Sequence, residues 1–166
     1  RDGRALVVVV SDPTDLQMID EWAVLLGTPV RVMVGARSAI EGILHARRTD
    51  PRVGDWLAGA QAADAAGQRA LDLIGRAYRR HACIPARLAQ ETARLTSVAQ
   101  GIWANARATD DVAAFLPTLA QILDLRREAG QALSAGGFGA DAYDALIDEH
   151  EPGATAATLK AMFDRM

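Results

Sequence analysis

Residues 85–108 read PARLAQETARLTSVAQGIWANARA, and this stretch decides how most of the chain folds. Apolar side chains recur in it every few residues and form a stripe that polar residues interrupt once. The stripe consists of Leu88, Leu95, Val98, Ile102 and Trp103. This spacing is typical of an amphipathic α-helix that buries one face. At about 3.6 residues per turn, the stretch makes a helix of roughly six turns. Other parts of the chain must pack against its apolar face.

The residues around this stretch also favour helices, and no convincing strand appears after about Asp50. Asp50-Pro51 and Ile84-Pro85 each place a proline at a predicted helix start, where its missing N–H costs nothing. Asp110 is predicted to cap the next helix, which contains Pro117. We expect Pro117 to kink that helix, or to mark a short helix that runs into a longer one.

Further helices are predicted over residues 64–81, 141–150 and 155–165, with a glycine-rich loop over 136–139. Their apolar residues, and those of the helix after Asp110, recur at helical spacing and are predicted to be buried. These residues are Leu71, Ile74, Tyr78, Val112, Phe115, Leu116, Leu119, Ile122, Leu123, Leu133, Leu159, Met162 and Phe163.

The beginning of the chain follows a different pattern. Residues 5–10 (ALVVVV) and 30–34 (VRVMV) read as strands, and residues 16–26 and 38–46 read as helices. A strand–helix–strand unit implies a parallel pair with a right-handed crossover, and such a pair needs cover on both faces. The predicted fold class is therefore α+β, mostly α. A small βαβα segment over residues 1–46 is followed by a helical bundle over residues 47–166.

Composition excludes several partners and compartments. The chain has 166 residues, a mass of 17.7 kDa, a net charge of -3 and a pI near 5.6, so neither nucleic acid nor an anionic membrane surface is an expected partner. No apolar run approaches the roughly 20 residues that cross a bilayer, so no membrane insertion is expected. Cys83 is the only cysteine, which excludes an internal disulfide and favours a reducing, cytoplasmic compartment. Because the chain opens at Arg1, we expect a piece of a longer protein.

The histidines and the cysteine do not form a recognisable catalytic or metal site. His45, His81 and His150 are far apart, and none has the spacing of metal ligands. His150-Glu151 begins like the zinc motif H-E-x-x-H, but the second histidine is missing and Pro152-Gly153 breaks the helix. Cys83 is predicted to be a buried or partly buried structural thiol. We therefore predict no catalytic, cofactor-binding or metal-ligating residue in this chain.

Three other groups of residues are predicted to be structural. Four acidic residues are expected on a solvated helix face near a turn: Asp144, Asp148, Glu149 and Glu151. Three arginines are expected to form a solvated basic patch: Arg76, Arg79 and Arg80. Three tryptophans are expected to be core anchors: Trp22, Trp56 and Trp103.

From about Leu44 to the end, the chain resembles the N-terminal helical region of the Taq-type thermostable carboxypeptidases. The resemblance rests on runs at 85–88 (PARL), 103–107 (WANAR) and 143–153 (YDALIDEHEPG), and on Asp111, Phe115, Pro117 and Leu119. It implies a helical, usually dimeric zinc enzyme, about three times as long as this chain, that removes C-terminal residues from peptides. The zinc helix of that family lies downstream of the matching region, so the resemblance assigns no catalytic residue here.

From Asp2 to about Ala46, the chain is similar to part of the N-terminal domain of type II secretion and type IV pilus assembly ATPases. The similarity rests on residues 3–15 (GRALVVVVSDPTD), 27–30 (GTPV) and 39–41 (AIE). It implies a segment that docks a protein of the secretion machinery. The ATPase domain of that family has no counterpart here, so no ligand role is carried over.

Three hypotheses for function follow. In the first hypothesis, the chain is an inactive fragment of a zinc carboxypeptidase, with zinc only in the complete enzyme. In the second hypothesis, it is a module that binds a secretion protein through residues 1–46. The third hypothesis is a chimera, joined near Leu44-His45, with no evolved function. Surfaces that a missing remainder would cover favour self-association or a homodimer.

Overall fold

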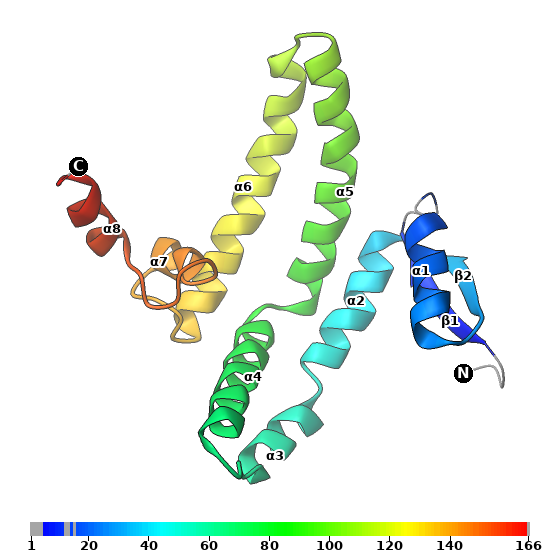
Figure 1. Ribbon diagram of the computed structural model, residues 1–166. Helices are drawn as coiled ribbons and strands as arrows, with labels where there is room; N and C mark the ends of the chain where they lie inside the picture. Colours follow the sequence, from blue (N-terminus) through cyan, green and yellow to red (C-terminus); the bar gives the residue numbers. More distant parts are fainter. Residues whose placement is uncertain (1–4, 12–13, 15, 166) are drawn as a thin grey trace.

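The computed structural model describes residues 5–11, 14 and 16–165 (Figure 1). Strands and helices alternate at first: β1 (Leu6–Val10), α1 (Leu16–Leu26), β2 (Val30–Val34) and α2 (Arg37–Arg48). The two strands pair in parallel, with Leu6 beside Val30 and Val10 beside Val34. The predicted βαβα unit is confirmed.

Only helices follow in the part of the chain that the structure describes. They are α3 (Pro51–Gly59), α4 (Ala65–Cys83), α5 (Ala86–Ala108), α6 (Val112–Ala135), α7 (Ala142–Ile147) and α8 (Ala156–Phe163). The predicted fold class, α+β and mostly α, is confirmed.

Aspartate side chains begin several of these helices. The carboxylate of Asp50 accepts a hydrogen bond from the backbone N–H of Arg52 at 3.1 Å, and Asp64 accepts one from Gly67 at 2.7 Å. The cap of α6 is Asp111, which accepts from the N–H of Ala114 at 3.1 Å. The prediction that Asp110 caps this helix is wrong by one residue. Asp110 has a positive φ of 54°, so it turns the chain between α5 and α6 and leaves the cap position to its neighbour.

Pro117 lies inside α6, which continues without interruption from Val112 to Ala135. Of the two predicted alternatives at this proline, a short helix that runs into a longer one is therefore wrong, and a kink stays a prediction. Pro117 has no N–H to give to the carbonyl of Ala113, but the loss of this one bond near the start of the helix does not end it.

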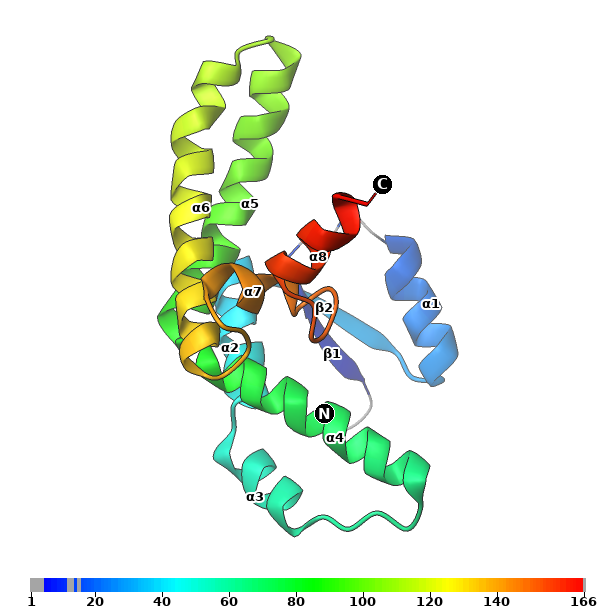
Figure 2. The ribbon, with the colours of Figure 1, turned by 90° about the vertical axis from the view of Figure 1, so that its left-hand side faces the viewer.

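Helix α5 is the central element of the helical region. It packs against α2 on one side and α6 on the other, and α6 in turn packs against α7. Figures 1 and 2 show that the far half of the α5–α6 hairpin extends away from all other elements, while the strands and α1 lie beyond α2. Helix α3 contacts α4, and α8 contacts α7.

The buried core is small and lies near the base of the hairpin. Leu88 is 1% exposed, and a cluster of Leu133, Phe138 and Ala145 joins α6 to α7. Cys83 is partly buried and packs against this cluster, as predicted for a structural thiol.

Many side chains that were predicted to be buried are exposed instead. They are Ile74, Val98, Trp103, Val112, Leu116, Leu119, Leu123, Met162 and Phe163. The prediction that Trp56 and Trp103 anchor the core is wrong, since they are 67% and 47% exposed. The total exposed surface is 11729 Å², whereas a compact protein of this mass exposes roughly 8,000 Å². The helices form an open layer, so their apolar faces exceed what the neighbouring helices cover.

Substitution of two glycines by alanine tests how closely the helices approach one another. A Cβ atom on Gly130 of α6 would lie 2.6 Å from the carbonyl oxygen of Ala142, whereas a Cβ atom on Gly101 of α5 would meet nothing within 4 Å. We expect Gly130→Ala to lower the free energy of unfolding by about 1–3 kcal/mol, because the α6–α7 contact must open. Gly101→Ala, the matched control, should raise it by about 0.5–1 kcal/mol. Urea titration followed by circular dichroism measures both, and equal effects would contradict the close packing.

Candidate functional site

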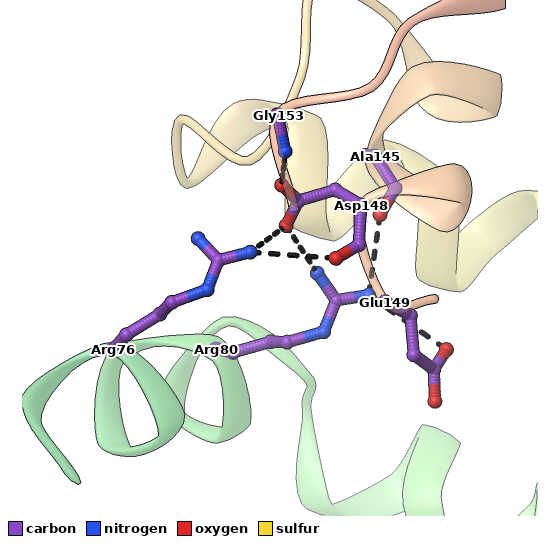
Figure 3. Close-up of polar contacts among 6 residues, drawn as sticks. All are labelled: Arg76, Arg80, Ala145, Asp148, Glu149 and Gly153. Atoms are coloured by element: carbon purple, nitrogen blue, oxygen red, sulfur yellow. Dashed lines mark hydrogen bonds and ion pairs between the residues drawn. The ribbon is translucent and has the colours of Figure 1, made fainter. Parts of the chain in front are cut away.

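Among the described residues, a dense polar cluster connects α4 to the end of α7. Arg76 and Arg80 lie one turn apart on α4, and both guanidinium groups face the carboxylate of Asp148 (Figure 3). Nη1 of Arg80 lies 3.2 Å from Oδ2 of Asp148, and Nη2 of Arg76 bonds to the same oxygen. A carboxylate held by two guanidinium groups is a strong, charge-assisted contact.

Further hydrogen bonds fix the remaining groups of this cluster. The N–H of Gly153 donates to Oδ1 of Asp148 at 3.1 Å, and Nη2 of Arg80 donates to the carbonyl of Ala145 at 3.2 Å. Glu149 adds an ion pair with Arg80 at 3.7 Å. Both carboxylate oxygens of Asp148 are therefore already occupied.

The aromatic ring of Phe138 completes the cluster. The Cζ atoms of Arg76 and Arg80 lie 5.5 and 5.4 Å from the ring centroid. Stacked guanidinium groups gain cation–π attraction and cover the ring from water. The sequence pattern places Phe138 only in a glycine-rich loop and predicts no role for it.

A second carboxylate, that of Asp144 on α7, contacts the first residue of α8. Its Oδ1 accepts a hydrogen bond from the N–H of Ala156 at 2.8 Å, and the residue is 8% exposed. The prediction that Asp144 and Asp148 lie on a solvated face is wrong, while Glu149 and Glu151 are exposed. The predicted solvated arginine patch is also wrong for Arg76 and Arg80, which lie partly buried against these acids. The charges of Arg76, Arg80, Asp148 and Glu149 therefore neutralise one another within this cluster.

The histidines are divided between two regions. His45 is 8% exposed and lies near His81, whereas His150 is exposed near the end of α7. Burial lowers the pKa of His81 below its usual value, and electrostatic interactions with Arg48 and His45 lower it further. Across residues 5–11, 14 and 16–165, no three His, Cys, Asp or Glu side chains are grouped so that they could hold a metal ion. That the chain holds no zinc stays a prediction.

Removing the charge of Asp148 tests what the cluster contributes. Asp148→Asn keeps the shape but leaves two guanidinium groups without their anion, so we expect a loss of about 2 kcal/mol in the free energy of unfolding. The matched control is Asp124→Asn on α6, where the pair with Arg127 is exposed and a change under about 0.5 kcal/mol is expected. Chemical denaturation of both variants measures this difference. Two equally mild variants would show that the cluster adds nothing to stability.

Known proteins share both the fold and the sequence of this chain. A solved structure described as the BsuCP crystal structure superposes with a TM-score of 0.66, at 23% identity, over 77% of this chain and 26% of that one. Thermostable carboxypeptidase 1 of Thermus thermophilus is 36% identical over 139 residues, which are 76% of this chain and 27% of the relative. Carboxypeptidase 1 of Bacillus subtilis is 29% identical over 96 residues, or 58% of this chain and 19% of the relative. The chain thus spans about a quarter or less of these relatives.

The family model of the carboxypeptidase Taq (M32) metallopeptidases matches residues 17–166. The matched range begins inside the predicted 1–46 segment. The division of the chain into two units remains a prediction. The similarity of residues 2–46 to secretion ATPases also remains a prediction. The match covers most of the chain and agrees with the resemblance of residues 44–166. The chain belongs to the M32 family of metallopeptidases.

Proposed function

We propose that this chain forms the helical, groove-lining part of a zinc carboxypeptidase and has no peptidase activity by itself. The match of residues 17–166 to the M32 family carries the proposal. The relatives are named carboxypeptidases, and this chain corresponds to about a quarter of their length or less. In the complete enzyme, the bond broken would be the last peptide bond of the substrate.

A metallopeptidase needs a metal ion, and the donor groups described in this chain do not fit one. The carboxylate oxygens of Asp148 accept from guanidinium and backbone N–H groups, and Asp144 holds the start of α8. In the described residues no set of three donors comes together. We therefore propose that the zinc ligands and the general base lie outside these residues.

An exposed apolar seam on α6 supports the proposal that a further segment covers this region. The seam consists of Val112, Leu116, Leu119 and Leu123, which are 66%, 53%, 37% and 45% exposed. Their spacing of four, three and four residues is that of a coiled-coil face. Residues 112–123 contain no charged side chain. Exposed apolar patches of this kind usually mark a contact surface.

We expect the chain by itself to have no peptidase activity. The purified chain, assayed with an N-blocked dipeptide and added Zn²⁺ or Co²⁺, should release no C-terminal amino acid above the buffer rate. Thermostable carboxypeptidase 1 of Thermus thermophilus, assayed in parallel, serves as the positive control. Release that is lost on adding a chelator and that follows the purified chain through chromatography would overturn the proposal.

We also propose that, when no other segment covers the α6 seam, a second copy of the chain does so. Leu116→Glu together with Leu123→Glu places charges on the seam and should shift the chain toward a monomer. The matched control, Ala114→Glu, adds a charge to the same helix at an exposed position outside the seam. Light scattering after size-exclusion chromatography measures the molar mass. A wild-type chain that stays at 17.7 kDa at high concentration would contradict this contact.

No helix among the described residues is long and apolar enough to cross a membrane. A cytoplasmic location and a secretion partner for residues 1–46 stay predictions.

A further inference from the structure

A cavity of about 340 Å³ lies on the face of α5 between α2, α6 and α7, with the end of α4 at its side. Its floor is apolar and consists of Ile84, Leu88, Leu133 and Leu146. Leu88 and Leu133 are 1% and 3% exposed, so this floor belongs to the core of the fold. The volume falls in the range of roughly 300–1,000 Å³ that small-molecule sites occupy.

Charged and titratable side chains surround this apolar floor: Arg37, Glu41, Arg80, His81, Arg126 and Glu149. The acids among them are already paired. Glu41 bonds to Arg48 at 3.2 Å, and Glu149 pairs with Arg80, which also binds Asp148.

Two cations of this cavity remain without a partner. The structure gives Arg37 of α2 and Arg126 of α6 no hydrogen bond or ion pair with any described residue. They approach the cavity from opposite sides of α5, since α2 and α6 flank that helix. The cavity therefore joins an apolar floor to an excess of positive charge at its rim.

His81 also lines the cavity, and other cations lie near it. Burial is the main cause of its lowered pKa, and Arg48, His45 and Arg80 lower the pKa further, against the opposing effect of Glu41. A site where cations disfavour a further positive charge is a site where an anion is stabilised.

We propose that this cavity binds a small organic carboxylate that carries an apolar chain, with the carboxylate at the cationic rim, on Arg126, and the chain on the apolar floor. Guanidinium groups suit this ligand because their paired N–H groups match the two oxygens of a carboxylate. The apolar floor selects against small hydrophilic anions, which gain nothing from it. The proposal does not depend on peptidase activity, because it uses no metal and no residue outside the described chain.

Octanoate is a suitable probe for calorimetric titration of the full chain at neutral pH. We expect one saturable site with a Kd of about 1 mM or tighter. Acetate lacks the apolar chain, and octylamine carries the opposite charge, so each should bind at least about tenfold more weakly. Equal binding of octanoate and octylamine would overturn the proposal.

Arg126→Gln should raise the Kd for octanoate about tenfold, the loss expected for a charge-assisted contact. The matched control is Arg127→Gln, one residue along α6, because Arg127 pairs with Asp124 at 2.7 Å and does not line the cavity. Its Kd should equal that of the unmodified chain. Equal Kd values for the two variants would show that the carboxylate does not contact Arg126.

Proton NMR of His81 separates this site from adsorption on the exposed α6 seam. A carboxylate in the cavity should raise the pKa of His81 toward its usual value, because a nearby anion favours the imidazolium form. Adsorption on the seam would give more than one octanoate per chain and leave His81 unchanged. That result would also overturn the proposal.

Discussion

The packing of α5 between α2 and α6 is the contact on which the rest of the structure depends. Leu88, Leu95, Ala99 and Ala106 of α5 are buried in it, and α5 has its most extensive contacts with α2 and α6. The side-chain amide of Gln90 on α5 lies against Gly42 of α2, where a Cβ atom would come within 2.7 Å of its nitrogen. These four buried side chains give α5 a defined packing position although the total core is small.

The polar cluster of α4 and α7 adds a second, directional contact to this apolar one. Burial alone would leave α7 free to slide along α6, since apolar contacts have little directionality. Two guanidinium groups on one carboxylate fix both the position and the rotation of the helix end. Phe138 lies under the guanidinium groups and joins this cluster to the core of Leu133 and Ala145. The same helices form the wall of the arginine-lined cavity, so its shape depends on both contacts.

Helix positions could be predicted because they depend on local spacing, caps and prolines. Burial could not be predicted as well, because an apolar stripe shows which face seeks cover but not whether cover is present. The α6 seam illustrates this: Leu116 and Leu123 have the spacing of buried residues and lie exposed. The pairing of Arg76 with Asp148 joins residues 72 positions apart, which a local pattern cannot show. One signal was available, since Arg76 and Arg80, like Asp144 and Asp148, are four residues apart and share a helix face.

The long separation of that ion pair has a consequence for the order in which the chain assembles. The α5–α6 hairpin closes over a short turn at Thr109–Asp111, so bringing its helices together costs little chain entropy. Docking of α7 on α4 instead closes a loop of some seventy residues. The chain entropy lost in this closure is small only if the α5–α6 hairpin has formed first. We therefore expect α7 and α8 to dock last and to detach first. Hydrogen exchange at the Gly153 amide, which bonds to Asp148, would report this local opening before the hairpin unfolds.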